Sequence, residues 1–153
     1  MQSQVKPIIR PAVIGDAEAI YRINLTALGY QYSLRETADS LSSILGKPNV
    51  KIFAAEADGR VAGYIHGADY DCTYSPPLKN ILALGVLEEY RERGIGRLLV
   101  AELEAWAKAD GCAGVRLVSS FNRAEAHKFY LRLGYADRKD QKNFMKLFEG
   151  RAR

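Results

Sequence analysis

The clearest pattern of apolar and polar positions lies between residues 81 and 106. Residues 81–87 are apolar without interruption, which is typical of a strand buried on both faces. From Ile95 onward, apolar residues recur at three- and four-residue spacing, as expected for a helix with one buried side, at Leu98, Leu99, Leu103 and Trp106. Gly94 and Gly96 lie between the two patterns. The sequence therefore predicts a buried strand, a glycine turn and the start of a helix.

The remaining chain shows the same alternation of patterns. Before the buried strand, it predicts a strand at 6–10, helices at 17–28 and 34–45, and two strands at 50–57 and 60–68 joined by the hairpin pair Asp58-Gly59. Residues 69–79 are predicted as a loop. After the helix that ends near Asp110, we expect a strand at 115–119, a helix at 121–133, and strands at 135–137 and 143–148.

This order of elements predicts an α/β fold with a mixed sheet and helices on both faces. We expect about seven strands flanked by about four helices. A length of 153 residues is that of one ordinary domain. We therefore expect a single domain at residues 1–149, followed by a loose tail at 150–153.

Composition narrows the class of protein. Hydrophobic residues make up 48% of the chain and charged residues 26%, which is typical of a folded globular protein. No apolar run reaches the roughly 20 residues of a membrane helix, and the N-terminus lacks the pattern of a signal peptide. Cys72 and Cys112 lie far apart without the spacing of metal ligands. We expect a cytoplasmic protein that binds no metal.

The net charge of +4 allows a nucleic-acid-binding domain as an alternative function. That class of protein usually concentrates lysine and arginine in one stripe, whereas here the basic residues are spread along the chain. Local clusters occur at 91–97 and 128–142. A small polyanionic ligand would account for the first cluster, and a solvated surface for the second.

The glycine turn has the chemistry of a phosphate site. The first N–H groups of a helix lack internal partners, and the helix dipole adds positive charge there. Arg91, Arg93 and Arg97 add formal charge around the turn. Leu99 occupies the position where a mononucleotide P-loop or a dinucleotide-binding fingerprint needs glycine, so both of these sites are excluded.

What remains is Arg-x-x-Gly-x-Gly at Arg91, Gly94 and Gly96, which resembles the pyrophosphate loop of the GNAT superfamily of N-acetyltransferases. A second motif, Ala-His-Lys-Phe-Tyr at 126–130 followed by Gly-Tyr at 134–135, resembles the fourth helix of that family. The order of elements is also similar over essentially the whole chain. The resemblance implies the GNAT fold and transfer of an acetyl group from acetyl-CoA to a primary amine of a small molecule or peptide.

The resemblance also implies coenzyme-binding residues. In the family, the pantetheine arm pairs with main-chain groups of the central strand, where a bulge separates it from its neighbour. Gly85 would suit that bulge. The coenzyme residues carried over by position are Leu84, Val86, Arg91, Glu92, Arg93, Gly94, Ile95, Gly96 and Arg97. Many relatives have a coenzyme-binding asparagine at the position of Arg123, whereas here Asn122 comes one residue earlier. The sequence leaves open which of the two makes this contact.

Tyr130 occupies the position at which many family members have a tyrosine near the coenzyme sulfur. The departing thiolate, with a thiol pKa near 8.5, must regain a proton, and a tyrosine hydroxyl can donate one. A general base must take the proton of the acceptor amine. The candidates are His66, Asp69 and Glu88, of which His66 has the best-suited pKa. We expect His127 to make only local contacts.

The acceptor site in this fold is walled by the segments that correspond to 29–33 and 69–74. They contain Tyr30, Tyr32, Asp71 and Tyr74 in addition to Asp69. An aromatic and acidic wall favours a cationic amine. The acceptor itself stays open among small amines, antibiotics, amino acids and protein amines. A coenzyme-binding sensor without catalysis is the alternative within the same fold, and a homodimer is possible.

Overall fold

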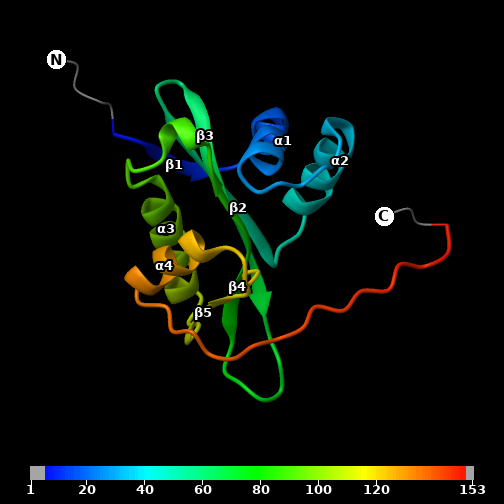
Figure 1. Cartoon of the computed structure of the whole chain (residues 1–153), viewed down its shortest axis with the longest axis vertical. Coiled ribbons are helices and arrows are strands. Elements are labelled where there is room, and N and C mark those ends of the chain that lie inside the picture. Colours follow the sequence, from blue (N-terminus) through cyan, green and yellow to red (C-terminus); the bar gives the residue numbers. More distant parts are fainter. Residues whose placement is uncertain (1–5, 151–153) are drawn as a thin grey trace. The chain divides into compact units, whose positions relative to one another are not determined.

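The computed structural model describes residues 6–150, and the chain divides into two compact units between Val118 and Ser119. The first unit carries all five strands and three α-helices (Figure 1). Its elements are β1 (Ile8–Pro11), α1 (Ala17–Thr26), α2 (Leu34–Leu45), β2 (Val50–Ala57), β3 (Arg60–Tyr70), β4 (Leu78–Val86), α3 (Ile95–Ala109) and β5 (Gly114–Leu117), with short 3₁₀ turns η1 (Ile14–Asp16) and η2 (Glu88–Tyr90). The second unit contains α4 (Ala124–Arg132).

The five strands form one mixed sheet in the order β1-β2-β3-β4-β5. The first three pairings are antiparallel and the β4–β5 pairing is parallel. The mixed α/β architecture is confirmed, but the expected strands at 135–137 and 143–148 are absent from the described chain. An alternating pattern shows only that a segment can pair, whereas a strand also needs a neighbouring edge.

Helices cover the two faces of the sheet (Figure 1). On β3, the missing side chains of Gly63 and Gly67 allow close approach of α3, because a Cβ at Gly67 would lie 2.4 Å from Leu103 Cδ1. We call this side the α3 face. Tyr64 points to the opposite side, where its hydroxyl contacts Asn24 of α1. We call that side the α1 face.

The loop before β4 is shorter than expected, because β3 continues to Tyr70 and β4 begins at Leu78. Asp69 and Lys79 are directly opposite each other in this added pairing. Lys79 is buried on the α3 face, with Nζ at 2.6 Å from Asp69 Oδ1 and 2.7 Å from Asp110 Oδ2. The two carboxylates offset the cost of burying the ammonium group, so they stabilise the extension of both strands.

Candidate active site

The central feature of the site is an open edge of β4. β5 pairs with Leu78–Ile81 and then ends, so residues 82–86 have no strand beside them on that side within the sheet. The register between β3 and β4 shifts at the same point, because His66 lies opposite Ala83 and Gly67 opposite Ile81. Leu82 is therefore the extra residue of a β-bulge. The expected bulge at Gly85 was wrong.

Gly85 has a different role, which is close packing of α1 on β4. It pairs in register with Tyr64, and a Cβ at this position would lie 2.6 Å from Ile23 Cγ2. Ile23 is fully buried in α1. The glycine therefore brings the helix directly over the strand that forms the open edge.

The register shows which main-chain groups face the open edge. Residues of an antiparallel pair alternate between hydrogen-bonded and non-hydrogen-bonded positions. Leu87 N donates to Ala62 O at 2.8 Å, and Gly63 lies opposite Val86. Val86 and, two residues earlier, Leu84 are thus at non-hydrogen-bonded positions, and their N–H and C=O groups point away from β3. Both residues were candidates for pairing with the pantetheine arm.

The open edge leads into the glycine loop before α3. Glu92 and Gly94 both have positive φ, at 66° and 78°, and Gly94 is the N-cap of α3. Alternating left-handed residues turn successive N–H groups toward one point and create a site for anions. The first turn of α3 has no acidic residue, and Leu98 N is the first amide bonded back to Gly94 O. The loop therefore presents free N–H groups, as expected for a phosphate site.

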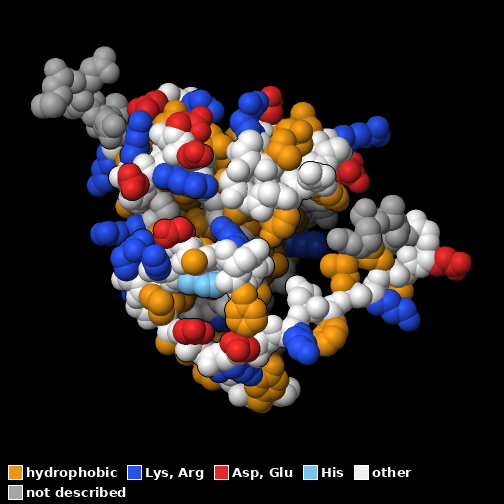
Figure 2. Space-filling view, viewed as in Figure 1, with side chains coloured by type: hydrophobic (Ala, Val, Ile, Leu, Met, Phe, Trp, Pro, Cys, Tyr) orange, Lys and Arg blue, Asp and Glu red, His pale blue; other side chains and the backbone are white. Residues whose placement is uncertain are grey.

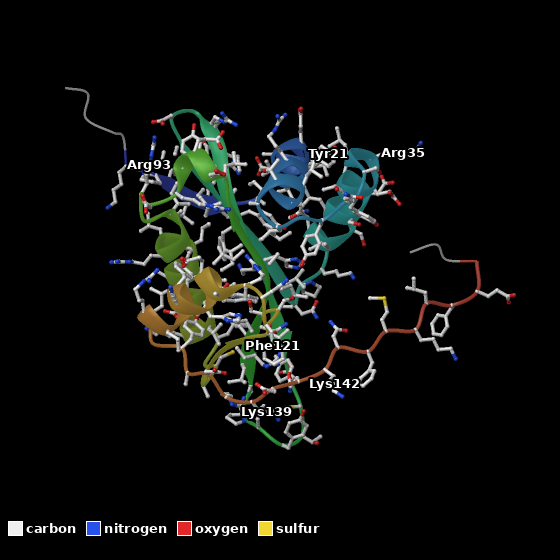
Figure 3. All side chains as sticks on the ribbon, viewed as in Figure 1. Tyr21, Arg35, Arg93, Phe121, Lys139 and Lys142 are labelled. Carbon is white, nitrogen blue, oxygen red and sulfur yellow. The ribbon has the colours of Figure 1, made fainter. Side chains whose placement is uncertain are left out.

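The three arginines of the loop differ in their contacts. Arg93 lies beside the start of α3 (Figure 3), with Nη1 at 2.9 Å from Asp58 Oδ2 and its guanidinium 4.9 Å from the Tyr90 ring. It ties the loop to the β2–β3 hairpin. Arg91 Nε lies 3.4 Å from the outward-facing Val86 O. Arg97 is exposed and has no ion pair among residues 6–150.

The three candidates for the general base have different surroundings. His66 is half-buried on the α1 face beside the bulge, and burial lowers the pKa of its ring below 6.5. Asp69 is held by Lys79 on the opposite face. Glu88 is exposed in η2. Only His66 combines a position on the α1 face with a neutral, proton-accepting ring at pH 7.

Tyr30 also belongs to the α1 face. Its main-chain N–H donates to Asn24 O at 2.8 Å. Burial raises the pKa of Tyr64 to about 12, and the nearby Tyr30 adds to this shift. The candidate acceptor residue Tyr30 and the candidate base His66 are thus brought to the same side of the sheet as Tyr64 of β3.

The other proposed acceptor residues lie on exposed segments. Tyr32 and Tyr74 expose 47% and 81% of their surface, and Asp71 is exposed as well. A hydrogen bond to Tyr70 contributes to a raised pKa of Tyr74. The negative charge expected in the wall of the acceptor site is smaller than predicted, because Asp69 forms an ion pair with Lys79.

Two polar residues on the α1 face, Arg116 and Asn80, were not predicted as site residues, whereas their neighbour Tyr70 lies in the predicted acceptor segment 69–74. Arg116 of β5 donates from Nη1 to Asn80 Oδ1 at 2.6 Å, and its guanidinium lies 4.3 Å from the Tyr70 ring. These residues come from three adjacent strands, and only the sheet brings them together. The sequence feature that could have indicated a functional role is the arginine at position 116, inside a short strand that is otherwise apolar.

The second unit carries the candidate general acid. The Tyr130 ring packs edge-on against Phe129 and Tyr135, and burial raises the pKa of its hydroxyl to about 12. His127 Nε2 donates to Ser120 O at 2.9 Å, which confirms a local contact. Asn122 and Arg123 are both exposed.

The described residues give little support to other classes of site. No three His, Cys, Asp or Glu side chains among residues 6–150 are grouped as a metal site. None of the described helices has the length and apolar character needed to cross a membrane. On the face shown in Figure 2, basic and acidic side chains are interspersed, unlike the basic stripe typical of nucleic-acid-binding proteins.

Comparisons with known proteins agree with this geometry. A family model described as the acetyltransferase (GNAT) family matches residues 17–135. An aminoalkylphosphonate N-acetyltransferase of Salmonella typhimurium is 28% identical over 137 residues, which cover 88% of this chain and 89% of that protein. An uncharacterized N-acetyltransferase of Methanocaldococcus jannaschii is 34% identical over 138 residues, covering 86% and 80%.

Solved structures show the same fold. The structure of the aminoglycoside N-acetyltransferase AAC(6')-Iy in complex with CoA superposes with a TM-score of 0.84 at 19% identity. The superposition covers 95% of this chain and 97% of that one.

Proposed function

The chain belongs to the GNAT family of acetyltransferases and is an N-acetyltransferase, and we propose that its acceptor is a small-molecule primary amine that reaches the thioester from the α1 face. The observation that carries this proposal is the open edge of β4. The outward main-chain groups of Leu84 and Val86 form a line that ends at the anion-binding loop around Gly94.

Acetyl-CoA is the co-substrate. Its pyrophosphate suits the glycine loop before α3, and its pantetheine arm suits the open edge of β4. The loop from Arg91 to Arg97 is proposed to hold the pyrophosphate, through the N–H groups of Glu92, Gly94, Ile95 and Gly96 together with the charges of Arg91 and Arg97. Arg93, which is held by Asp58, positions the loop. The pantetheine arm then pairs with Val86 and Leu84, so the thioester lies toward the bulge at Leu82. Asn122 and Arg123 belong to the second unit, and a coenzyme contact from one of them stays a prediction of the sequence.

The reaction proposed for this site is direct transfer. The amine nitrogen attacks the thioester carbonyl, and its proton passes to His66 Nδ1 or Nε2, directly or through a water molecule. Burial keeps the ring of His66 neutral at pH 7, so it can accept a proton. The Leu84 N–H, which points to the open edge, stabilises the negative charge on the carbonyl oxygen. The C–S bond then breaks to release the coenzyme thiolate.

Tyr130 is proposed to donate a hydrogen bond to the leaving sulfur. Its pKa of about 12 keeps the hydroxyl protonated at neutral pH. Complete transfer to a thiolate whose conjugate acid has a pKa near 8.5 is uphill. Stabilisation of the developing thiolate by a hydrogen bond is therefore its main contribution, and the proton follows as the coenzyme leaves.

The named relatives include enzymes for aminoalkylphosphonates and aminoglycosides, which are small polar amines. We therefore propose an acceptor of this size. The test is release of free thiol from acetyl-CoA across a panel of small amines, with mass spectrometry of the acetylated product. Acetyl-CoA binding without acetylation of any amine in the panel would favour the sensor alternative.

A further inference from the structure

The guanidinium of Arg116 is a half-buried cation without a carboxylate partner in the described chain. Its contacts are the amide oxygen of Asn80 and the aromatic ring of Tyr70, and neither of these is a carboxylate. The other buried or half-buried cations among residues 6–118 each pair with a carboxylate. Arg10 bonds Asp16 and Glu56, Lys79 bonds Asp69 and Asp110, and Arg93 bonds Asp58.

Removing a cation from water costs free energy unless an anion compensates for it. The charge of Arg116 is therefore not compensated within the described chain, and its guanidinium is free to bind an anionic group of a ligand. The bond to Asn80 uses only Nη1, and no described residue accepts from Nε or Nη2. The ring of Tyr70 holds the plane of the guanidinium, so little side-chain entropy remains to be lost on binding. The two free donors, Nε and Nη2, form a planar pair whose spacing matches the two oxygens of a carboxylate or phosphonate. We call this pair of donors the guanidinium fork.

Its position relates Arg116 to the proposed reaction. Asn80, to which Arg116 is bonded, lies opposite Ala68 on β3, and His66 lies two residues before Ala68 on the same face. Two residues along a strand span roughly 7 Å, and neighbouring strands lie about 5 Å apart, so the backbones at His66 on β3 and Arg116 on β5 are separated by roughly 12 Å. A molecule that places its amine near His66 can therefore place a charged group at Arg116 when a chain of several bonds joins the two groups.

We infer that Arg116 determines acceptor specificity by binding a carboxylate or phosphonate group of the acceptor amine. This inference rests on the function proposed above, and it reverses the sequence-based expectation of a cationic acceptor. That expectation relied on Asp69 and Asp71, and Asp69 is paired with Lys79 on the other face of the sheet. An acceptor that carries an anionic group supplies the charge that Arg116 lacks in the protein.

The experiment compares matched acceptors in wild-type protein and variants. The acceptors are ω-amino carboxylates and ω-aminoalkylphosphonates of increasing chain length, each beside an uncharged amide or alcohol of the same length. The variants are Arg116→Gln, which removes the charge, and Arg116→Lys, which keeps the charge but loses the fork. Arg22→Gln is the control, because Arg22 is an exposed arginine that pairs with Glu18 on α1. Thermal unfolding and calorimetry with acetyl-CoA check folding and coenzyme binding.

We expect wild-type protein to prefer the anionic member of each pair. Arg116→Gln should raise KM for the anionic acceptors about 10- to 100-fold, the range for hydrogen bonds between charged groups, and leave KM for the neutral acceptors nearly unchanged. Arg116→Lys should restore part of the preference, and the control variant should behave as wild type.

The two proposals fail in different ways. Equal KM changes for both members of a pair in Arg116→Gln, or a wild-type preference for neutral acceptors, would overturn the anion inference while acetylation itself continues. A difference between carboxylates and phosphonates would identify which oxyanion the fork accepts. If no amine of any kind releases thiol, the proposed acceptor site and the inference built on it are both wrong.

Discussion

The most specific prediction concerns one hydrogen-bond donor, the main-chain N–H group of Leu84. The register places it on the open edge of β4, away from β3. Replacing Leu84 with its α-hydroxy analogue, through nonsense suppression or semisynthesis, exchanges the N–H for an ester oxygen. The side chain is retained. Because this N–H takes no part in the ladder with β3, we expect little change in the free energy of unfolding.

The matched control is the same exchange at Leu87. Its N–H donates to Ala62 O at 2.8 Å, so the ester there removes one hydrogen bond of the ladder. One such bond contributes about 0.5–1.5 kcal/mol, and leaving the Ala62 carbonyl unsatisfied raises the cost toward about 1–3 kcal/mol. For a protein of this length, each kcal/mol shifts Tm by about 2–4 °C. Turnover at saturating substrate should be unaffected.

The two esters should therefore have opposite effects. At position 84, loss of a donor to the thioester oxygen should lower kcat by about 100- to 1,000-fold with a nearly unchanged Tm. At position 87, Tm should fall by several degrees with a nearly unchanged kcat. The assays are thiol release at saturating acetyl-CoA and thermal unfolding of the same samples. A wild-type kcat for the ester at 84, or a Tm as low as that of the ester at 87, would refute the assignment of Leu84 to the open edge.

Four further predictions test other parts of the structure. Gly96→Val should weaken acetyl-CoA binding, because a branched side chain crowds the approach of phosphate to the start of α3; calorimetry on folded protein measures this, and an unchanged affinity contradicts it. Tyr130→Phe should lower kcat about 10- to 1,000-fold with little change in coenzyme affinity, whereas wild-type turnover would leave Tyr130 a packing residue. Burial lowers the pKa of His66 below 6.5, so kcat/KM should fall as the pH drops through that lowered pKa and the ring becomes protonated. His66→Gln should remove this fall of kcat/KM at low pH. Arg10 holds the pKa of Asp16 below 3.8, so this pair contributes stability above that pH and loses it as pH falls further; unfolding of Asp16→Asn should depend less on pH in that range.

Much of the fold could be predicted from local patterns. The helices near 17–28, 34–45 and 95–110 each have one apolar side, and the last two end at Gly46 and Asp110, so their positions follow from their own residues. The Asp58-Gly59 hairpin is present, with both residues at positive φ. The strands at 135–137 and 143–148 were wrong, because pairing depends on a neighbouring edge that no local pattern describes.

The sequence by itself determined the glycine turn that is proposed to bind the coenzyme. Gly94 adopts a left-handed conformation that glycine allows at no steric cost, and the N–H groups without internal partners follow from the predicted start of a helix at that point. These are local properties of neighbouring residues, so a short motif can encode them.

Only the tertiary structure decided which charged residues stand near the proposed acceptor side. Asp69 looked like a free carboxylate in a loop, but the pairing of β3 with β4 places it beside Lys79 on the α3 face. Arg116, Asn80 and Tyr70 are separated by up to 46 positions, and three strands bring them together on the α1 face. Whether a charged residue is paired or free depends on which strand lies next to it. Spacing along one strand indicates the face of a side chain but not its neighbours across the sheet.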